Sequence, residues 1–344
     1  MNQTGIAIIG AGIAGCYAAS LLSASGHRVT LIEKSRGLGG RCSLRYINDK
    51  QTIDLGAASF SLDDLNSNTV TNTRLRTCIA RCQKQQHIAD WSATLSSFDD
   101  PGIRTQISEL CGVPTMNQLH RALAQEIDLI TKTRVERLVS QDDYWLLMNA
   151  DKLTVLKAKK VIVTAPALQT RPLYDWPKSW QAVINKAADA SRPQWVCALA
   201  FDNPQDQLAD VYRGNHAVLA QAVRDNGKPG RNREQEVWVL HSGTQWANNH
   251  LETPPEQAAE QMAKAFVQAL GISDKYHILT SHRWLLSIHD IPATPESYLF
   301  DDRTGLGICG DWLGGPGILG ALNSSDQLCA RIINDDLISG QSHE

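Results

Sequence analysis

The sequence lacks a strong excess of either charge, with 33 Lys and Arg against 36 Asp and Glu and a net charge of −3. It therefore lacks the basic surface with which proteins bind nucleic acids, and we expect no nucleic-acid partner. No apolar run approaches the ~20 residues that span a bilayer, so we expect no membrane partner. The apolar start of the chain lacks the basic flank of a signal peptide, which predicts a cytoplasmic protein.

Cysteine pairs with metal-ligand spacing are also missing. The eight cysteines are scattered, no CxxC occurs, and Cys78 and Cys82 stand one helical turn apart. We expect reduced, mostly buried thiols and no metal site. With 344 residues and 42% hydrophobic content, the chain is long enough for two domains, or for one with a substantial insertion.

The sequence does contain a glycine-rich turn between a predicted strand and a predicted helix. The apolar run Ile6–Ile9 leads into Gly10, Gly12 and Gly15, and a second apolar run ends at Glu33. Gly10 permits the sharp turn, Gly12 lets the backbone approach a pyrophosphate, and Gly15 lets the helix pack closely on the strand. The helix N-terminus attracts phosphate, and Glu33 stands where an acid binds the adenosine ribose. This pattern predicts dinucleotide binding.

The residues after the ribose acid indicate which dinucleotide binds. Two arginines and a Gly–Gly pair follow at once, and a buried FAD needs such enclosure of its pyrophosphate and flavin, whereas an NAD site seldom does. A surface turn with two solvated arginines is the alternative. The first part of the FAD site is predicted to comprise Gly10, Gly12, Ile13, Ala14, Gly15, Glu33, Lys34, Arg36, Gly39, Gly40 and Arg41.

Three later segments are expected to complete the FAD site. The glycine-rich turn Gly56–Ser59 follows a predicted strand, and its backbone is expected to lie close to the isoalloxazine ring. The alternative is an ordinary strand-to-helix turn. The backbone of Val135 is expected to contact the adenine; the alternative is that Val135 is a plain core valine. An aspartate near the C-terminus binds the ribityl chain, and the helix after it faces the flavin N1–C2=O edge. The predicted contacts are Gly56, Ala57, Ala58, Ser59, Val135, Gly310, Asp311, Gly317, Ile318 and Ala321.

The hydrophobic periodicity between these segments predicts the remaining helices and strands. Helices are expected within residues 63–91, after residue 112 and over Pro255–Leu270. Strands are expected over residues 42–46, 51–54, 130–139, 144–148, 153–157, 160–166, 194–201, 217–222, 236–241 and 277–286. The basic, Gly- and Pro-rich segment Arg224–Arg233 is interpreted as a solvated hairpin loop.

These elements predict an α/β fold, α+β overall, with two domains that alternate along the chain. A Rossmann-type FAD-binding domain is assigned to residues 1–60, 112–168 and 301–344. A substrate domain with a mixed sheet is assigned to residues 61–111 and 169–300.

The chain resembles the renalase-like branch of the flavin amine oxidase superfamily over nearly its whole length. The resemblance rests on the segments IAIIGAGIAG, EKSRGLGGRCS, DLGAASF, GVPTMNQL, KPGR, VWVLHSGTQWA, HRWL, CGDWLGG and GILGA. It implies an FAD domain of the p-hydroxybenzoate hydroxylase type with non-covalent FAD. It also implies hydride transfer from 2- or 6-dihydro isomers of NAD(P)H to flavin N5, with reoxidation by O2 to H2O2.

The chain departs from the pattern of this family at three places. Ser59 stands where an aromatic residue is expected, the segment after Trp284 lacks the usual Tyr-Ala run, and Ser325 replaces a glycine. These positions are expected to help line the flavin face, so they bear on the choice of substrate more than on the fold.

The candidate substrate contacts are His241, His282 and Trp284. A dihydropyridine donor needs orientation over the flavin more than acid–base chemistry, so a sparse apolar pocket is predicted. The alternative for each histidine is a hydrogen-bonded strand residue. An amine, porphyrin or carotenoid type of flavin oxidase, a flavin-binding sensor without turnover, and a nicotinamide dehydrogenase without flavin are alternative functions. The small-molecule substrate and the oligomeric state stay open.

Overall fold

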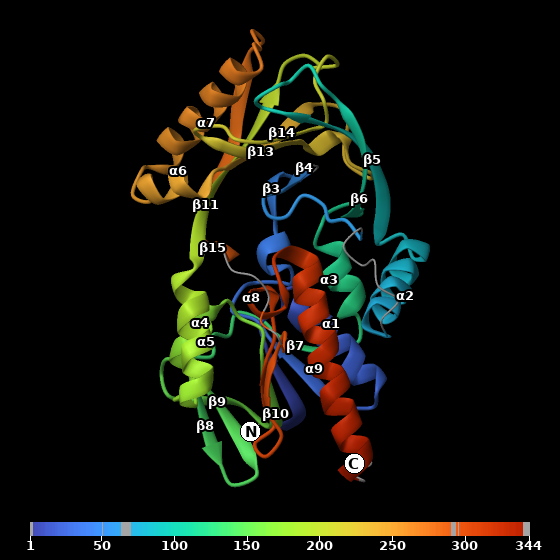
Figure 1. Ribbon diagram of the computed structural model, residues 1–344, viewed down its shortest axis with the longest axis vertical. Helices are drawn as coiled ribbons and strands as arrows, with labels where there is room; N and C mark the ends of the chain where they lie inside the picture. The colour runs from blue at the N-terminus through green and yellow to red at the C-terminus, as the bar shows by residue number, and fades with distance from the viewer. Residues whose placement is uncertain (1–2, 50, 63–69, 290–293, 295, 340–344) are drawn as a thin grey trace.

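The computed structural model describes residues 3–339, apart from residues 50, 63–69, 290–293 and 295. It has two large β-sheets, placed one above the other along the long axis of the molecule, and a small hairpin between them (Figure 1). No helix in the described part of the chain is long and apolar enough to cross a membrane.

The first sheet has eight strands and includes the strand before the glycine-rich turn. Its order is β16-β17-β10-β1-β2-β7, with the hairpin β8–β9 paired to β10. All neighbours from β17 to β7 are parallel, which favours strands buried on both faces. The strands are β1 (Gln3–Ile9), β2 (Val29–Ile32), β7 (Asp128–Ile130), β8 (Arg137–Gln141), β9 (Tyr144–Met148), β10 (Thr154–Val163), β16 (Leu299–Asp301) and β17 (Leu306–Ile308).

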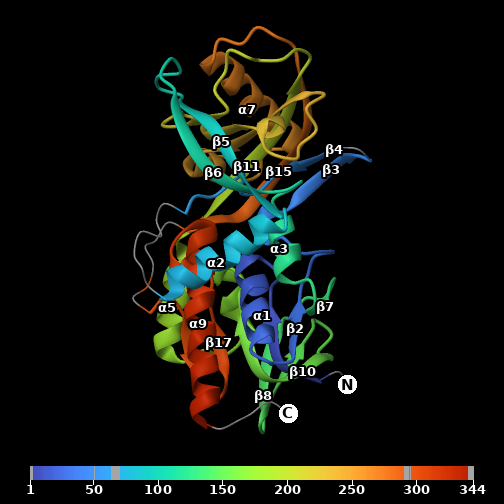
Figure 2. The same cartoon turned by 90° about the vertical axis from the view of Figure 1, so that its right-hand side faces the viewer.

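Helices cover both faces of this sheet because alternate side chains of β1 are apolar on both. Ile6 and Ile8 pack with α1 and α9, whereas Ala7 and Ile9 pack with α5. Helices α1 and α9 lie side by side in both views (Figure 1, Figure 2). The helices of this half are α1 (Ile13–Ala24), α3 (Gln118–Leu123), α4 (Ala167–Thr170), α5 (Lys178–Asp189), α8 (Asp311–Gly314) and α9 (Gly317–Ser339).

The second sheet has seven strands in the order β15-β11-β14-β13-β12-β5-β6. Helices α6 and α7 cover one face of it, and the hairpin β3–β4 packs under the other (Figure 1). The seven strands of the sheet are β5 (Ile88–Ser97), β6 (Thr105–Gly112), β11 (Ser191–Phe201), β12 (Val211–Arg213), β13 (Leu219–Arg224), β14 (Glu236–Ser242) and β15 (Tyr276–His289), and the separate hairpin consists of β3 (Leu44–Asn48) and β4 (Gln51–Asp54). The helices are α2 (Val70–Lys84), α6 (Thr244–Asn249) and α7 (Pro255–Ala269).

Most predicted elements are confirmed, and two strand predictions are wrong. The expected strand over 130–139 is broken, because β7 ends at Ile130 and Lys132 adopts a positive φ of 53° before β8 begins. The expected strands over 153–157 and 160–166 are a single strand, β10. It stays continuous because β1 pairs with it from Lys157 to Val163.

The prediction of a solvated loop at Arg224–Arg233 is wrong. Lys228 is 1% exposed, and its Nζ lies 2.9 Å from Asp54 Oδ2 and 2.6 Å from Asp225 Oδ1. Arg231 also pairs with Asp54 and donates to the carbonyl of Gly112 at 3.0 Å. Two cations and two anions therefore form a balanced buried cluster that joins β4 to the second sheet.

The packing of α5 bears on the proposed domain division. Ile184, Ala187 and Ala188 pack in one cluster with Trp145 and Val163 of the first sheet. This contact favours a domain boundary near residue 190 over the expected one at 168. The division of the chain into domains remains our proposal.

His120 on α3 predicts an acid-sensitive fold. Its side chain is 1% exposed, and burial lowers its pKa to about 4 although the backbone of Met116 acts in the opposite direction. Between pH 6.5 and 4 the unfolded chain binds more protons than the folded one, so stability falls as pH falls. The expected contribution is about 3 kcal/mol by pH 4. Urea unfolding of His120→Leu should show a free energy of unfolding that lacks this decrease between pH 6.5 and pH 4.

A matched control is available on the surface. The side chain of His277 is 49% exposed, so His277→Leu should keep the acid loss of the wild-type chain. An equal acid loss in wild type and His120→Leu would contradict the assignment.

Candidate functional site

The glycine-rich turn has the geometry that the sequence predicts. Gly10 has a φ of +105°, and a Cβ on Gly15 would lie 2.0 Å from the Gly10 carbonyl oxygen. A Cβ on Gly12, in contrast, would meet none of the described atoms within 4 Å. Gly15 is therefore required for packing of the helix on the strand, while Gly12 borders open space.

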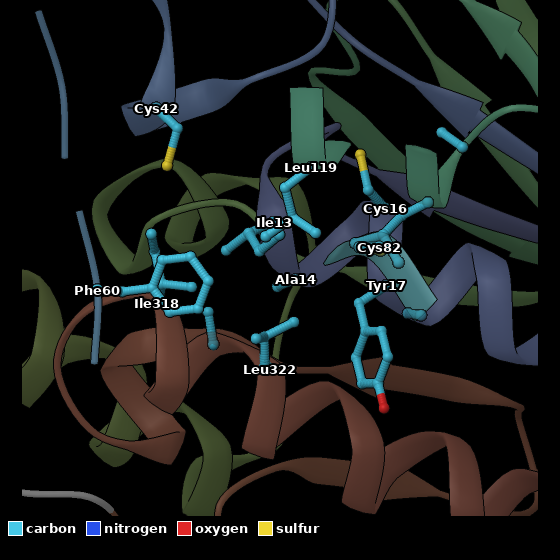
Figure 3. Packing of buried hydrophobic residues seen from close by; sticks show 14 of the residues in the cluster. Ile13, Ala14, Cys16, Tyr17, Cys42, Phe60, Cys82, Leu119, Ile318 and Leu322 are labelled. Atoms are coloured by element: carbon cyan, nitrogen blue, oxygen red, sulfur yellow. The ribbon is translucent and has the colours of Figure 1, made fainter. Parts of the chain in front are cut away.

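The N-terminus of α1 presents unpaired backbone N–H groups at this turn. Gly12 is the N-cap, and no side chain of the described residues caps the helix or places an acid in its first turn. Ile13 and Ala14 are buried against Ile318 and Leu322 of α9 (Figure 3). An uncapped helix end next to open space suits an anion such as a phosphate.

Glu33 is buried at the end of β2 and is 7% exposed. Its Oε2 accepts from the backbone N–H of Ala11 at 2.9 Å, and its Oε1 accepts from that of Ser35 at 2.8 Å. Each carboxylate oxygen can accept more than one hydrogen bond, so both oxygens keep the capacity to accept from a further donor. Glu33 thus fixes the turn through two hydrogen bonds from the backbone.

The segment after Glu33 folds back over the turn. Gly39 donates to the carbonyl of Ala11 at 3.1 Å, and a Cβ on Gly40 would lie 3.1 Å from Gly12 Cα. Arg41 Nη2 lies 2.6 Å from Asp311 Oδ1; burial disfavours the charge of Arg41, but Asp311 raises its pKa above the ordinary value. This ion pair therefore joins the N-terminal dinucleotide segment to the C-terminal segment around Asp311.

Lys34 and Arg36 lie apart from this arrangement, although both were predicted as cofactor contacts. Both are exposed, and Lys34 Nζ donates to Gln169 Oε1 at 2.9 Å. Their contact with a cofactor stays a prediction.

The segment Gly56–Ser59 lies against Arg41. A Cβ on Gly56 would lie 1.8 Å from the Arg41 carbonyl oxygen, and Ala57 donates to that oxygen at 2.9 Å. Ala58 is buried, while the Ser59 hydroxyl donates to Glu109 instead of extending freely into the site. This backbone therefore packs on the segment that follows Glu33, and its approach to the isoalloxazine ring stays a prediction.

The C-terminal segment closes the same region through glycines. Gly310 donates to Ser324 Oγ at 2.9 Å, and Gly317 at the start of α9 has a φ of +76°. A Cβ on Gly320 would lie 1.6 Å from the Gly315 carbonyl oxygen, so this turn requires glycine. Ile318 and Ala321 on the same helix are buried.

Two other predicted positions lie in packed surroundings. Val135 is 6% exposed in the core of the first sheet, and its adenine contact stays a prediction. Ser325 donates to the Ala14 carbonyl at 3.0 Å and to that of Ala321 at 2.9 Å. The Ser325 hydroxyl, at a position where the renalase-like resemblance leads one to expect a glycine, therefore joins α9 to α1.

The structure brings His241, His282 and Trp284 onto one face of the second sheet. Val196 of β11 pairs with both His241 and His282, and Trp284 lies two residues further along β15. The rings of His282 and Trp284 lie 4.4 Å apart, and Trp284 Nε1 donates to the carbonyl of Leu55 at 2.8 Å. This face is the one turned toward the β3–β4 hairpin and the dinucleotide motif.

Both histidines are held in the neutral form at pH 7. Burial, followed by Lys228, lowers the pKa of His241 to about 4, and burial, followed by Arg45, lowers the pKa of His282. His241 Nε2 has no hydrogen-bond partner among the described residues, so the alternative of a satisfied strand histidine does not describe that atom. We call His241, His282 and Trp284 the wall. These side chains can orient a ligand and form hydrogen bonds to it, but the two histidines are weak bases.

Sequence reasoning missed three polar residues beside this wall. Glu109 accepts from Arg213 Nη2 at 2.8 Å, and Arg213 pairs with Gln221 across β12 and β13. Side chains alternate between the two faces along β12 and β13. Whether Arg213 and Gln221 share a face therefore depends on the register of the two strands, which the sequence does not show.

His282 also borders a groove of about 430 Å³ with Trp195, Pro255 and Arg283. Arg283 and Trp195 lie on the face of the sheet covered by α7, because they alternate with His282 and Val196. Apart from His282, which borders both, this groove therefore lies on the opposite face of the sheet from the side chains that face the dinucleotide motif.

The N-terminal segment matches known dinucleotide-binding sequences. Residues 8–70 match the family described as NAD(P)-binding Rossmann-like domain. A 4,4'-diapophytoene desaturase of Staphylococcus haemolyticus is 42% identical over 60 residues, which cover 17% of this chain and 12% of that protein. The same enzyme of Staphylococcus aureus is 38% identical over 66 residues, or 19% and 13% of the two chains. The match thus spans about an eighth of the length of these relatives.

Solved structures match over nearly the whole chain. A putative protoporphyrinogen oxidase from Exiguobacterium superposes with a TM-score of 0.72 at 13% identity, over 97% of this chain and 99% of the other. Cyclohexylamine oxidase from Brevibacterium oxydans gives 0.69 at 11% identity, over 96% and 99%. Putrescine oxidase bound to putrescine gives 0.65 at 12%, over 96% and 99%. The chain therefore has a Rossmann-like dinucleotide segment at residues 8–70 and, over its whole length, the fold of these oxidases.

Proposed function

We propose that the chain binds FAD non-covalently and acts as an oxidoreductase. Three observations support FAD: the open space at Gly12, the uncapped N-terminus of α1, and the meeting of Arg41 with Asp311. Glu33 would hold the ribose, the α1 N-terminus and Arg41 the pyrophosphate, and the Gly310–Ile318 segment the flavin end. When bound, FAD supplies the hydride-accepting ring and passes electrons on to O2, which becomes H2O2.

We further propose that the hydride donor is a dihydronicotinamide, as the renalase-like resemblance implies. The observation that carries this proposal is the neutral wall of His241, His282 and Trp284. A dihydropyridine gains aromaticity when it loses a hydride, so it needs orientation and no strong base. Oxidation of an amine requires the neutral amine, and a base favours that form. The wall orients an aromatic ring and excludes water, but neither histidine is a strong base.

The test mixes the yellow protein anaerobically with 2-, 4- and 6-dihydro-NAD isomers and records the flavin absorption band. We expect the 2- or 6-dihydro isomer to bleach the band, and air to restore it with formation of H2O2. Putrescine and cyclohexylamine are the matched comparison because the solved oxidases of this fold include enzymes named for these amines.

Three other outcomes would each point to a different function. Bleaching by an amine but by no dihydronicotinamide would favour the amine oxidase alternative. A yellow protein that none of these donors reduces would favour a flavin-binding protein without turnover. A colourless protein that stays colourless when FAD is added would contradict the cofactor assignment.

A further inference from the structure

A row of polar side chains crosses the second sheet next to the proposed substrate wall. Arg213 pairs with Gln221 across β12 and β13, and Gln221 pairs with His241 across β13 and β14. Residues directly opposite each other in antiparallel strands place their side chains on the same face, with Cβ atoms about 5 Å apart. Arg213, Gln221 and His241 therefore share one face.

This face is turned toward the dinucleotide motif. Val211 and Val223, two residues from Arg213 and Gln221, pack in one cluster with Ala58 and Phe60. On β14, Val239 is two residues from His241 and packs in one cluster with Leu55 and Ile53 of the β4 segment. Because side chains alternate along a strand, the polar row points the same way as these valines.

The amide of Gln221 is oriented by its neighbours. In the orientation that satisfies both groups, Gln221 Oε1 accepts from Arg213 Nε at 3.0 Å and from Arg213 Nη2 at 3.2 Å. Arg213 is held in turn by Glu109, whose other carboxylate oxygen accepts from the Ser59 hydroxyl. With its oxygen committed to Arg213, the Gln221 amide offers two N–H donors to a further partner.

His241 supplies the complementary group beside these donors. It is 6% exposed, and its Nε2 has no hydrogen-bond partner in the described part of the chain. A buried polar atom without a partner is unfavourable, and a bound ligand recovers that free energy when it completes the hydrogen bond. In the neutral ring, one nitrogen carries a lone pair that accepts a hydrogen bond.

We propose that Gln221 and His241 form a subsite for a carboxamide, with Arg213 as the residue that positions the Gln221 amide. The proposal rests on the proposed function, because it identifies the group by which the substrate ring is held. The carboxamide oxygen accepts from Gln221 Nε2, and a carboxamide N–H donates to His241 Nε2. A protonated amine offers no acceptor for Gln221, and the single nitrogen of a neutral amine cannot place an acceptor at Gln221 and a donor at His241 in the way that the two atoms of a carboxamide do, so the pair favours a nicotinamide over an amine.

The experiment measures binding of nicotinamide and of 3-acetylpyridine to the oxidised, FAD-loaded protein by calorimetry. The acetyl group keeps the oxygen but lacks the N–H donors, so it loses only the bond to His241. We expect nicotinamide to bind about 10-fold more tightly than 3-acetylpyridine, the loss typical of one hydrogen bond. His241→Phe should reduce that ratio to about 1.

The variants on the other side of the subsite have a different signature. Gln221→Met should weaken both ligands about 10-fold and leave their ratio unchanged, since both carry the oxygen. Arg213→Met should have the same effect, and the double variant should lose no more than either single variant, because Arg213 acts through Gln221. Gln106→Met, exposed on β6, is the control and should change neither affinity.

Several outcomes would overturn the subsite: equal affinity for the two ligands, no binding of nicotinamide, or an unchanged ratio in His241→Phe. These failures are distinguishable from failure of the proposed function. A carboxamide preference without flavin reduction by any dihydronicotinamide would keep the subsite and contradict the hydride donor. Flavin reduction without the preference would do the reverse.

Discussion

Lys228→Met is expected to lower the free energy of unfolding by about 3–5 kcal/mol, the loss typical when one partner of a buried ion pair is removed. Lys228 contacts both Asp54 and Asp225, and all three side chains are almost fully buried. Burial disfavours the charge of Lys228, but Asp225 and Asp54 raise its pKa above the ordinary value. Without the lysine, two buried carboxylates share Arg231 alone. Urea unfolding at pH 7 measures the loss.

Two comparisons separate this explanation from loss of a long side chain. Lys264→Met removes an i,i+4 pair with Glu260 on the surface of α7, where the side chains are 60% and 44% exposed, so it should cost less than about 0.5 kcal/mol. Lys228→Met combined with Asp225→Asn should recover part of the loss, because the uncompensated charge is gone. A loss below about 1 kcal/mol for Lys228→Met alone would show that the cluster contributes little.

The dinucleotide half was largely predictable because its signals are local. The roles of Gly10 and Gly15 follow from backbone geometry within one turn, and the structure gives each the predicted conformation or contact. Helix α2 was predictable from Leu75, Ile79 and Cys82, whose helical spacing places all three in the core. Local patterns of this kind depend on few distant partners.

The charge cluster and the polar row were not predictable because their partners are distant in sequence. Lys228 reads as a solvated residue in a basic loop, and only the fold brings it to Asp54, 174 positions away. Gln221 likewise reads as one polar residue of a short strand. Its meaning depends on the register that pairs it with Arg213 and His241. The bulge between Leu219 and Gln221 makes that register invisible to a simple alternation.

Gly12→Ala is expected to remove FAD while leaving the fold intact. Gly12 has φ −76° and ψ −175°, which alanine adopts without strain, and the new methyl group meets no described atom within 4 Å. The methyl group instead occupies the space where the backbone is expected to approach the pyrophosphate. A steric conflict of about 1–3 kcal/mol weakens FAD binding roughly 10- to 100-fold. Flavin absorbance after gel filtration and a titration with FAD measure it.

Alanine substitutions of two neighbouring glycines separate a loss of FAD binding from a loss of stability. Gly37→Ala also meets no described atom within 4 Å, but it lies on the exposed segment and should keep both fold and flavin. Gly15→Ala places its Cβ 2.0 Å from the Gly10 carbonyl oxygen, so it should lower the melting temperature even without FAD. Gly12→Ala should match Gly37→Ala in the melting temperature of the apoprotein and differ from it in retained flavin. Full retention of FAD by Gly12→Ala would mean that the pyrophosphate lies elsewhere, because the glycine would then serve no approach of the ligand.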